Sequence, residues 1–321
     1  MIAPAHVAWL ENTGEVIETA DGREAEIWFL KHCDNSAILS AWATHFRQHY
    51  CRDEDLPDLV IDTGLSHSDF LTQIKFPDAA NAPGPSTRAG DFGEILVADF
   101  IEYVLGYWCP RHGRYEEREN RNVPSNGTDV IGFMFADEEP SFDDELLVIE
   151  AKAGFRPTKE NRLQQAIDDS GKDLVREAMS LSTIKQRLLK TNREEALKVG
   201  RFQNAGDRPF RRTNAAVAIL DADIFKKMAL IEADASEHPN GENLRLIVIW
   251  FTHFIRGLRM RPERESRLIL AAIQARAKMH EYRAAEEDYV PFRRAPETLF
   301  PLAVGILHDA AGAISGRFVY G

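Results

Sequence analysis

The sequence predicts an α/β protein in which helices flank a mixed central sheet. Apolar runs of strand length occupy 146–153, 215–220 and 244–251, and the segments between them repeat apolar residues at helical spacing. The resulting order of helix, strands, helix and strand is typical of a sheet covered by helices. With 321 residues, of which 44% are hydrophobic, the chain is long enough to bury a substantial core as one large domain or two smaller ones.

A small α/β region is predicted at the N-terminus, over residues 1–85. Within it, 25–30 has the character of a strand and 37–49 that of a helix with one apolar face. That face comprises Ile38, Leu39, Trp42 and Phe46. Residues 77–86 are rich in Pro, Ala and Gly and lack periodicity, which is typical of a linker. The sequence therefore predicts a domain boundary after residue 85 and a second domain over 86–321.

The second domain is predicted to begin with a helix over 92–105 and to continue with a strand over 128–135. A loop over 136–144 then reverses the chain, so that this strand pairs antiparallel with 146–153. The remaining predicted elements are a long helix over 161–189, strands over 215–220 and 244–251, and a helix over 266–284. The apolar stripe of the long helix comprises Leu163, Ala166, Ile167, Leu174 and Ala178.

Composition excludes several classes of protein. No apolar run approaches the roughly 20 residues that a membrane helix needs, so no membrane partner is expected. The N-terminus lacks the charged start and apolar core of a secretory signal. Cys33, Cys51 and Cys109 are widely separated, which argues against a disulfide framework and against a CxxC zinc site. We therefore expect a cytoplasmic protein with reduced cysteines.

The charge of the chain is unevenly distributed. Its net charge of −12 is unfavourable for binding nucleic acid, yet 185–212 is clearly basic. The residues expected to contact DNA there are Lys185, Arg187, Arg208, Arg211 and Arg212, and a second basic set comprises Arg256, Arg259, Arg261, Arg264 and Arg267. Acidic residues gather in 137–145, which is expected to be a solvated loop, although pairing of Arg208, Arg211 and Arg212 with that loop is an alternative. We therefore expect the chain to bind DNA weakly by itself.

The strongest chemical signal is the run Leu146-Leu147-Val148-Ile149-Glu150-Ala151-Lys152. Four consecutive apolar residues mark a buried strand, and alternation puts Glu150 and Lys152 on the same side of the sheet. Ionised groups at the edge of an apolar core are costly unless they are paired or bound to a metal. One hypothesis is a catalytic site in which the carboxylate holds a divalent metal and the ammonium orients the attacking water. The alternative is a structural ion pair at a strand end.

Asp129 adds a second carboxylate to the catalytic hypothesis. It follows the turn-like run Ser125-Asn126-Gly127-Thr128 and lies on the apolar face of the next strand. Antiparallel pairing of the two strands brings Asp129 close to Glu150 and Lys152. Mg²⁺ is commonly held by one or two carboxylates, with waters and substrate phosphate completing its coordination, and the backbone carbonyl of Ala151 is a further candidate ligand. The sequence thus predicts a Mg²⁺ site in which Mn²⁺ substitutes, whereas the alternative for Asp129 is a cap or turn residue.

Glu94 is a candidate for a third carboxylate at the site. On the helix predicted over 92–105 it shares a stripe with apolar residues, which favours an inward side chain, whereas Asp99 and Glu102 fall on the other side. The alternative is a capping box in which Asp91 caps the helix and Glu94 follows three residues later.

Gln164 flanks the apolar stripe of the long helix and is a candidate for binding a water or a phosphate at the site. The alternative is an ordinary surface glutamine. His112, Trp108 and His253 form no ligand spacing with another histidine or cysteine, so we assign them to packing.

Together, Gly93-Glu94, Gly127-Thr128-Asp129 and Glu150-Ala151-Lys152 resemble the motifs of the PD-(D/E)XK nucleases. The resemblance implies a restriction-endonuclease-like core of a helix, three strands, a helix and a further strand. It also implies the roles of five residues: Asp129 and Glu150 as metal ligands, Lys152 as the catalytic lysine, Glu94 as the carboxylate of the first helix, and Gln164 as a supporting polar residue. Thr128 stands where the family motif has proline, a variation that the superfamily tolerates.

A narrower resemblance, over residues 37–182, is to the HamA family of effectors in bacterial Hachiman antiphage systems. It is carried by AWATHFRQHYC at 41–51, IKFP at 74–77, GDFGE at 90–94 and GTD at 127–129. This resemblance implies a DNase that works with a helicase-like protein, HamB, which restrains it until abnormal DNA is sensed.

We therefore expect a Mg²⁺-dependent nuclease that hydrolyses phosphodiester bonds in DNA as part of antiphage defence. Two alternatives stay open. One is a non-catalytic nucleic-acid-binding or regulatory module on the same fold, because fold does not determine function. The other is a nuclease that acts on RNA, because contacts to a phosphate do not discriminate between nucleic acids.

Overall fold

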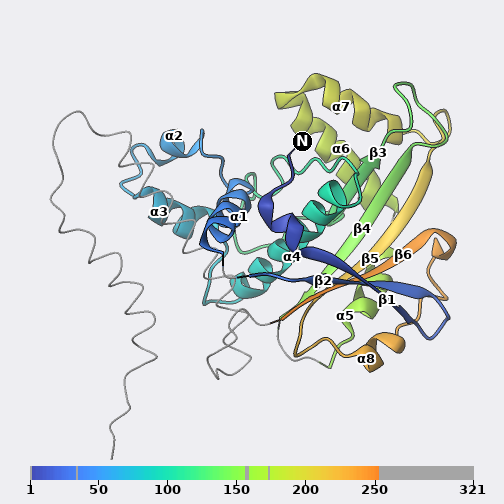
Figure 1. Cartoon of the computed structure of the whole chain (residues 1–321). Helices are drawn as coiled ribbons and strands as arrows, with labels where there is room; N and C mark the ends of the chain where they lie inside the picture. Colours follow the sequence, from blue (N-terminus) through green and yellow to red (C-terminus); the bar gives the residue numbers. More distant parts are fainter. Residues whose placement is uncertain (1, 34, 156–158, 173, 253–321) are drawn as a thin grey trace, which may run out of the picture. The chain divides into compact units, whose positions relative to one another are not determined.

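A computed structural model describes residues 2–33, 35–155, 159–172 and 174–252. In these ranges six strands form one mixed sheet, in the order β1-β2-β6-β5-β4-β3 (Figure 1). Their bounds are β1 Leu10–Glu18, β2 Glu24–Leu30, β3 Val130–Met134, β4 Glu145–Gly154, β5 Arg211–Asp221 and β6 Leu244–Phe251. The four central strands run parallel, while β1 and β3 are antiparallel edge strands. The prediction of a mixed sheet in an α/β protein is therefore confirmed.

Helices cover both faces of the sheet (Figure 1). The α-helices are α1 Ser36–Gln48, α2 Leu56–Val60, α3 His67–Phe70, α4 Gly84–Tyr103, α5 Arg162–Ser170, α6 Leu174–Thr191, α7 Arg193–Val199 and α8 Lys227–Ile231. Four single turns, η1 Ala5–Trp9, η2 Leu71–Lys75, η3 Gly200–Phe202 and η4 Gly241–Asn243, complete the helical elements. One face packs against α4 and α1, and the other packs against α5. α6 and α7 pack on β3 and β4 through a third apolar cluster.

The boundary predicted after residue 85 does not separate two sheets. β2, from the N-terminal region, pairs in parallel with β6, near the end of the described chain. The linker predicted over 77–86 is also partly wrong, because α4 begins at Gly84 and not near residue 92. Pro85 is tolerated in the first helical turn, where its missing N–H has no intrahelical partner to lose. The polar first turns of α4 lack apolar periodicity, which is why the sequence pattern did not show them.

The long helix predicted over 161–189 is two helices, α5 and α6, separated around Gly171. Gly171 caps α5 and lies against another segment, since a Cβ there would come within 2.8 Å of Pro239 Cδ. Because of the break, the residues of α6 that face the core are not those predicted for one continuous helix. Ala178 is consequently exposed, and Ser180 and Leu181 are among the buried residues of α6 instead.

Other expectations have simpler outcomes. β1 was not predicted, because seven of its nine residues are exposed along the edge of the sheet and it shows no alternation. All three cysteines are free thiols, as predicted. No helix in the described ranges combines the length and apolarity needed to cross a membrane. The helix predicted over 266–284, His253 and the second basic set from Arg256 to Arg267 lie outside the described residues.

Candidate active site

The pairing of β3 with β4 brings Asp129 to the strand that carries Glu150 and Lys152. Val130 pairs with Ile149, so Asp129, which precedes β3, lies beside the next part of β4. Its Oδ2 accepts a hydrogen bond of 3.0 Å from the backbone N–H of Ala151, the residue between Glu150 and Lys152. The predicted antiparallel pairing is confirmed. The carboxylate of Asp129 therefore contacts β4 and does not cap its own turn.

Gly127 determines how the chain enters this position. Its φ of +102° is in the region that favours glycine, and a Cβ there would lie 2.6 Å from Ser180 Oγ of α6. The same Oγ accepts a hydrogen bond of 2.9 Å from the N–H of Thr128. The turn before Asp129 is thus fixed against α6 by a close approach that only glycine allows.

Glu150 and Lys152 lie on the same side of the sheet, as alternation predicts. Lys152 Nζ lies 2.6 Å from Glu150 Oε1 and 2.7 Å from Asp169 Oδ2, at the end of α5. Partial burial alone would lower the pKa of Lys152, but the hydrogen bonds to Asp169 and Glu150 outweigh it and raise the pKa. Asp169 was not singled out from the sequence, although it follows buried Ala166 by three residues and so shares its side of the helix.

Glu94 lies in the middle of α4 and faces inward, as the stripe interpretation predicted. The capping-box alternative is wrong, because the helix begins well before Asp91. Asp91 is itself buried, and it accepts hydrogen bonds from Arg118 at 2.7 and 2.8 Å. Gly93 makes room for this arrangement, since a Cβ there would lie 3.1 Å from that of Ala153 on β4.

Arg114 and Tyr115 connect Glu94 with Asp129. Arg114 Nη2 lies 2.9 Å from Glu94 Oε2 and 3.8 Å from Asp129 Oδ1, and Tyr115 donates a 3.0 Å hydrogen bond to the same Glu94 oxygen. Both residues belong to the connection between α4 and β3, which carries no periodic pattern. Arginines recur there at positions 111, 114, 118 and 121, and this spacing was the available signal for Arg114.

Negative charge is in excess at this group of side chains. The carboxylates of Glu94, Asp129, Glu150 and Asp169 outnumber the cations of Arg114, Lys152 and Lys172 by four to three. Burial raises the pKa of Asp129 well above its usual range, and the charges of Glu94 and Glu150 raise it further. Burial also raises the pKa of Glu94, although Arg114 opposes that shift. A cation bound by these oxygens would relieve the repulsion.

The carboxylates of Glu94, Asp129 and Glu150 do not converge on one point. Among the described residues, Glu94, Asp129 and Glu150 do not form a group whose ligand atoms all lie within 4.8 Å. Each is held by a partner of its own: Arg114 for Glu94, the Ala151 amide for Asp129, and Lys152 for Glu150. In a β-strand the backbone N–H and C=O of one residue point toward the same neighbouring strand. Because the N–H of Ala151 bonds to Asp129, the carbonyl of Ala151 faces the same side.

Thr128 lines two hollows in the surface. A pocket of about 510 Å³ is lined by Glu94, Arg114 and Asp129, together with polar side chains from α6. A much smaller hollow of about 20 Å³ is lined by Glu150, Asp169 and cationic side chains, and Thr128 lines both. A substrate in the larger pocket would therefore approach Asp129 from the side of Glu94 and Arg114.

Gln164 is not brought to this group. Its side-chain amide donates a 2.9 Å hydrogen bond to the carbonyl of Asp234 and accepts one of 2.7 Å from the N–H of the same residue. These contacts fasten the loop after α8 to α5. The face of α5 that carries Asp169 reaches Lys152 instead.

The basic stretch over 185–212 is partly engaged in contacts within the molecule. Lys185 donates to Gln203, Arg187 pairs with Glu117, and Arg212 pairs with Glu177 at 2.6 Å. Arg211 Nη2 donates a 3.4 Å hydrogen bond to the carbonyl of Asp143, in the acidic loop. Arg208 is exposed. Arg211 thus contacts the acidic loop through a backbone carbonyl and not through an acidic side chain, whereas the ion pair with that loop is formed by Arg201, 2.6 Å from Asp144. Arg208 is accessible for binding.

Comparison with known proteins identifies the family. No curated protein matches the sequence closely enough to count as a relative. The model of the HamA family matches residues 5–253, which covers more than three quarters of the chain and contains every residue of the site described above. The chain therefore belongs to the HamA family, a component of the Hachiman antiphage systems.

Proposed function

We propose that this protein is a Mg²⁺-dependent nuclease that hydrolyses phosphodiester bonds in DNA. The observation that carries the proposal is the hydrogen bond from the amide of Ala151 to Asp129, which joins a desolvated carboxylate to the strand bearing Glu150 and Lys152. Desolvated carboxylates beside a lysine are the groups that metal-assisted phosphodiester hydrolysis needs. A structural ion pair alone leaves the excess negative charge around Asp129 unexplained.

Each residue has a role that follows from its position. Asp129, Glu150 and the carbonyl of Ala151 would hold the divalent ion, which supplies Lewis-acid charge at the phosphate and activates water. Lys152, placed between Glu150 and Asp169, orients the attacking water and offsets developing negative charge. Arg114 lines the larger pocket beside Asp129 and is placed to receive a phosphate oxygen when it leaves Glu94.

DNA delivery by a partner fits the charge of the chain. The protein has a net charge of −12, and four cations of its basic stretch, Arg187, Lys190, Arg201 and Arg212, are paired with carboxylates, which weakens the attraction of this stretch for a polyanion. We infer that a helicase-like protein of the HamB type brings the DNA to the site and restrains its cleavage. The basic residues that remain exposed, such as Arg208, then contribute modestly to affinity.

The direct test is to incubate the purified protein, alone and with its partner, with plasmid, linear duplex, single-stranded DNA and RNA. We expect cleavage of DNA with Mg²⁺ or Mn²⁺ and none in excess EDTA. Undiminished cleavage in EDTA contradicts the metal-dependent mechanism. Cleavage of RNA in place of DNA reassigns the substrate, and absence of cleavage under every condition supports the non-catalytic module.

A further inference from the structure

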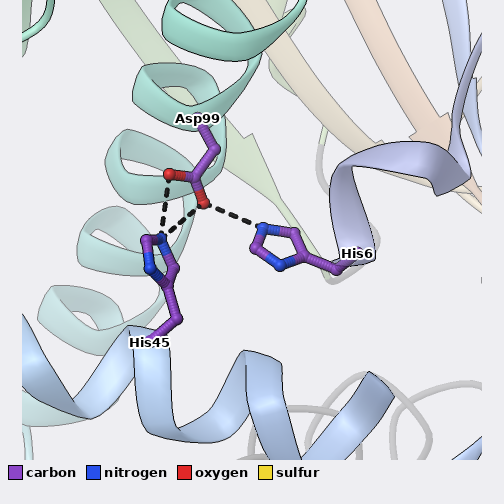
Figure 2. Close-up of side chains that lie close together, drawn as sticks. All are labelled: His6, His45 and Asp99. Carbon is purple, nitrogen blue, oxygen red and sulfur yellow. Dashed lines mark hydrogen bonds and ion pairs between the residues drawn. The ribbon is translucent and has the colours of Figure 1, made fainter. Parts of the chain in front are cut away.

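A second cluster of titratable side chains lies on a different side of α4 from Glu94, because a spacing of five residues separates two side chains by about 140° around a helix. His6 of η1, His45 of α1 and Asp99 of α4 converge, as Figure 2 shows. His6 Nε2 lies 2.9 Å from Asp99 Oδ2, and His45 Nε2 lies 3.0 and 3.1 Å from the two oxygens of Asp99. One ligand atom from each residue lies within 4.8 Å of the others. Three elements far apart in the sequence thus direct two imidazoles at one carboxylate.

The cluster is largely buried, and His45, whose side chain is 21% exposed, is its most accessible member. Asp99 is fully buried and His6 is 1% exposed, and neither lines the pocket beside Glu94. The ring of His6 stacks on Trp42, with centroids 4.7 Å apart and planes 10° apart. The ligand atoms are therefore positioned by packing before any ion binds, which lowers the cost of ordering them.

Hydrogen bonds within the protein do not complete this cluster. Arg111 donates a 2.6 Å hydrogen bond to Asp99 Oδ1 and also pairs with Glu102, so the fixed charges of these three residues sum to −1. Within the described ranges, His6 Nδ1 and His49 Nε2 are buried without a hydrogen-bond partner, although buried ring nitrogens normally have one. His49 follows His45 by one helical turn, and their rings are 4.9 Å apart. The cluster thus has a negative charge to balance, and the unpartnered Nε2 of His49 is a further nitrogen in a neighbouring ring.

We propose that His6, His45 and Asp99 bind a zinc-like transition-metal ion that fastens the N-terminal segment and α1 to α4. Two imidazole nitrogens and a carboxylate oxygen suit Zn²⁺, whereas Mg²⁺ prefers oxygen ligands. Ligand bonds of about 2.0–2.1 Å in a tetrahedral site separate ligand atoms by about 3.3 Å, so the two N···O distances need to open by a few tenths of an ångström. The two imidazole nitrogens, which lie within 4.8 Å of each other, need to come to about the same separation. Arg111 then holds the carboxylate from its Oδ1 side, as an outer partner of a metal ligand does.

This site is distinct from the proposed nuclease site, and its test does not use DNA cleavage. The full chain is stripped with chelator, dialysed and supplied with one equivalent of Zn²⁺. Bound metal is measured by elemental analysis, and thermal melting is recorded with and without Zn²⁺. We expect one bound zinc and a rise in Tm of several degrees. Co²⁺ in the same site should give the visible absorption bands of a low-coordinate ion with nitrogen and oxygen ligands.

Three variants separate a metal site from a hydrogen-bonded network. His45→Gln and Asp99→Asn keep side chains able to form hydrogen bonds, but each removes a good ligand, so both should lose the zinc, the gain in Tm and the Co²⁺ bands. Glu150→Gln alters the other site and should keep all three. Absence of bound zinc in the wild-type chain, or equal zinc binding by His45→Gln, overturns the proposal. If either variant is unfolded, the Co²⁺ spectrum of the wild-type chain decides, because a hydrogen-bonded network gives no such bands.

Discussion

Two carboxylates on α4, five positions apart, have opposite electrostatic environments. Glu94 faces the pocket, where burial raises its pKa despite the nearby charge of Arg114. Burial also acts on Asp99 and alone would raise its pKa, but hydrogen bonds from His45 and His6 and the charge of Arg111 lower it well below its usual range. The number of partners is therefore more important than the depth of burial in deciding which carboxylate is stably ionised.

The two carboxylates differ in access as well as in charge. Glu94 and Asp129 share one arginine and border a pocket of about 510 Å³, so an ion or a phosphate can enter and rearrange their contacts. Asp99 is fully buried and accepts hydrogen bonds from three side chains, of which His6 also stacks on Trp42 in the core. We therefore expect changes at the first site to affect turnover and changes at the second to affect stability.

The largest expected effect is on cleavage. Asp129→Ala and Glu150→Ala each remove a proposed metal ligand and little core volume, so we expect rates to fall by more than about a thousandfold, the equivalent of about 4 kcal/mol of transition-state stabilisation. Plasmid cleavage by single-turnover kinetics measures the rate, and thermal melting checks that both variants are folded. If the variants are largely unfolded but their folded fraction cleaves DNA at the normal rate, these residues have a structural role and not a catalytic one.

Lys152→Ala should reduce turnover by about a hundredfold while leaving metal affinity largely unchanged, because the ammonium acts on water and phosphate and is not a ligand. Titration calorimetry with Mg²⁺ or Mn²⁺ measures the affinity beside the kinetics. A variant that no longer binds the ion, under conditions in which the wild-type chain does, would make Lys152 a structural support of the ligands. Lys172→Ala is the matched control, since it also pairs with Asp169 but does not contact Glu150.

On the side of α4 that carries Asp99, Asp99→Ala should lower the free energy of unfolding by about 3–5 kcal/mol, because it leaves the largely buried guanidinium of Arg111 without one of its two carboxylate partners. Cleavage per folded molecule should be unchanged. Chemical denaturation of the metal-free protein gives the stability, and the fraction folded normalises the rate. A stable Asp99→Ala variant with impaired cleavage would mean that the two sides of α4 are not independent.

The pH dependence of stability should have opposite signs at Asp129 and Asp169. The pKa of Asp129 is raised in the fold, mainly by burial, so its ionisation destabilises the folded state increasingly as pH rises above about 4, the ordinary value of an aspartate. In the presence of chelator, the Tm of Asp129→Asn should therefore equal that of the wild-type chain at about pH 4 and exceed it at neutral pH. Mg²⁺ should reduce this advantage by stabilising the ionised wild-type carboxylate.

Asp169 provides the control for that experiment. Partial burial would raise its pKa, but hydrogen bonds from Lys152 and Lys172 outweigh it and lower the pKa. Its stabilising effect is present above the unfolded-state value and disappears as pH falls through the folded-state value. Asp169→Asn should thus be less stable than the wild-type chain at neutral pH and equal to it in acid. The same sign for both variants would contradict the assigned environments.

The smallest effects are expected in the basic stretch. Arg208→Glu should weaken DNA binding and lower the salt slope by about one unit with little change in Tm, because the side chain is exposed. Arg212→Glu should instead lower Tm, since it places a carboxylate beside Glu177. Binding isotherms at several salt concentrations and melting curves distinguish the two variants. An unchanged salt slope for Arg208→Glu would exclude this residue from the DNA contact.

The predictable parts of the molecule are those that depend on local periodicity. Alternation along β4 placed Glu150 and Lys152 on one side, and a turn before a strand placed Asp129 beside them. The break between α5 and α6 was missed because its cause, the close approach of Gly171 to Pro239, is a contact between distant segments. The start of α4 was missed because buried polar groups, and not an apolar stripe, hold its first turns.

The unpredicted parts of the two sites have the same origin. Arg114 contacts Glu94 from an irregular connection, and His6 contacts Asp99 across 93 residues of sequence, so no sequence spacing predicts either pair. For Gln164 the sequence position predicted a role at the site, but the tertiary structure directs its side-chain amide to the backbone of Asp234. Side chains whose partners lie in loops require the tertiary structure.

Gly93 gives a means of changing the spacing of the proposed nuclease site without altering any charge. A methyl group at this position would lie 3.1 Å from the Cβ of Ala153 and 3.4 Å from Ile219 Cδ1, which is tight enough to move the helix by a few tenths of an ångström. Glu94 is the next residue on that helix, whereas Glu150 and the Ala151 amide belong to the strand beneath it. Gly93→Ala would therefore change the distances from Glu94 to Asp129 and to Glu150 and leave the distance between Asp129 and Glu150 in place, so it separates the contribution of Glu94 from that of the proposed metal ligands.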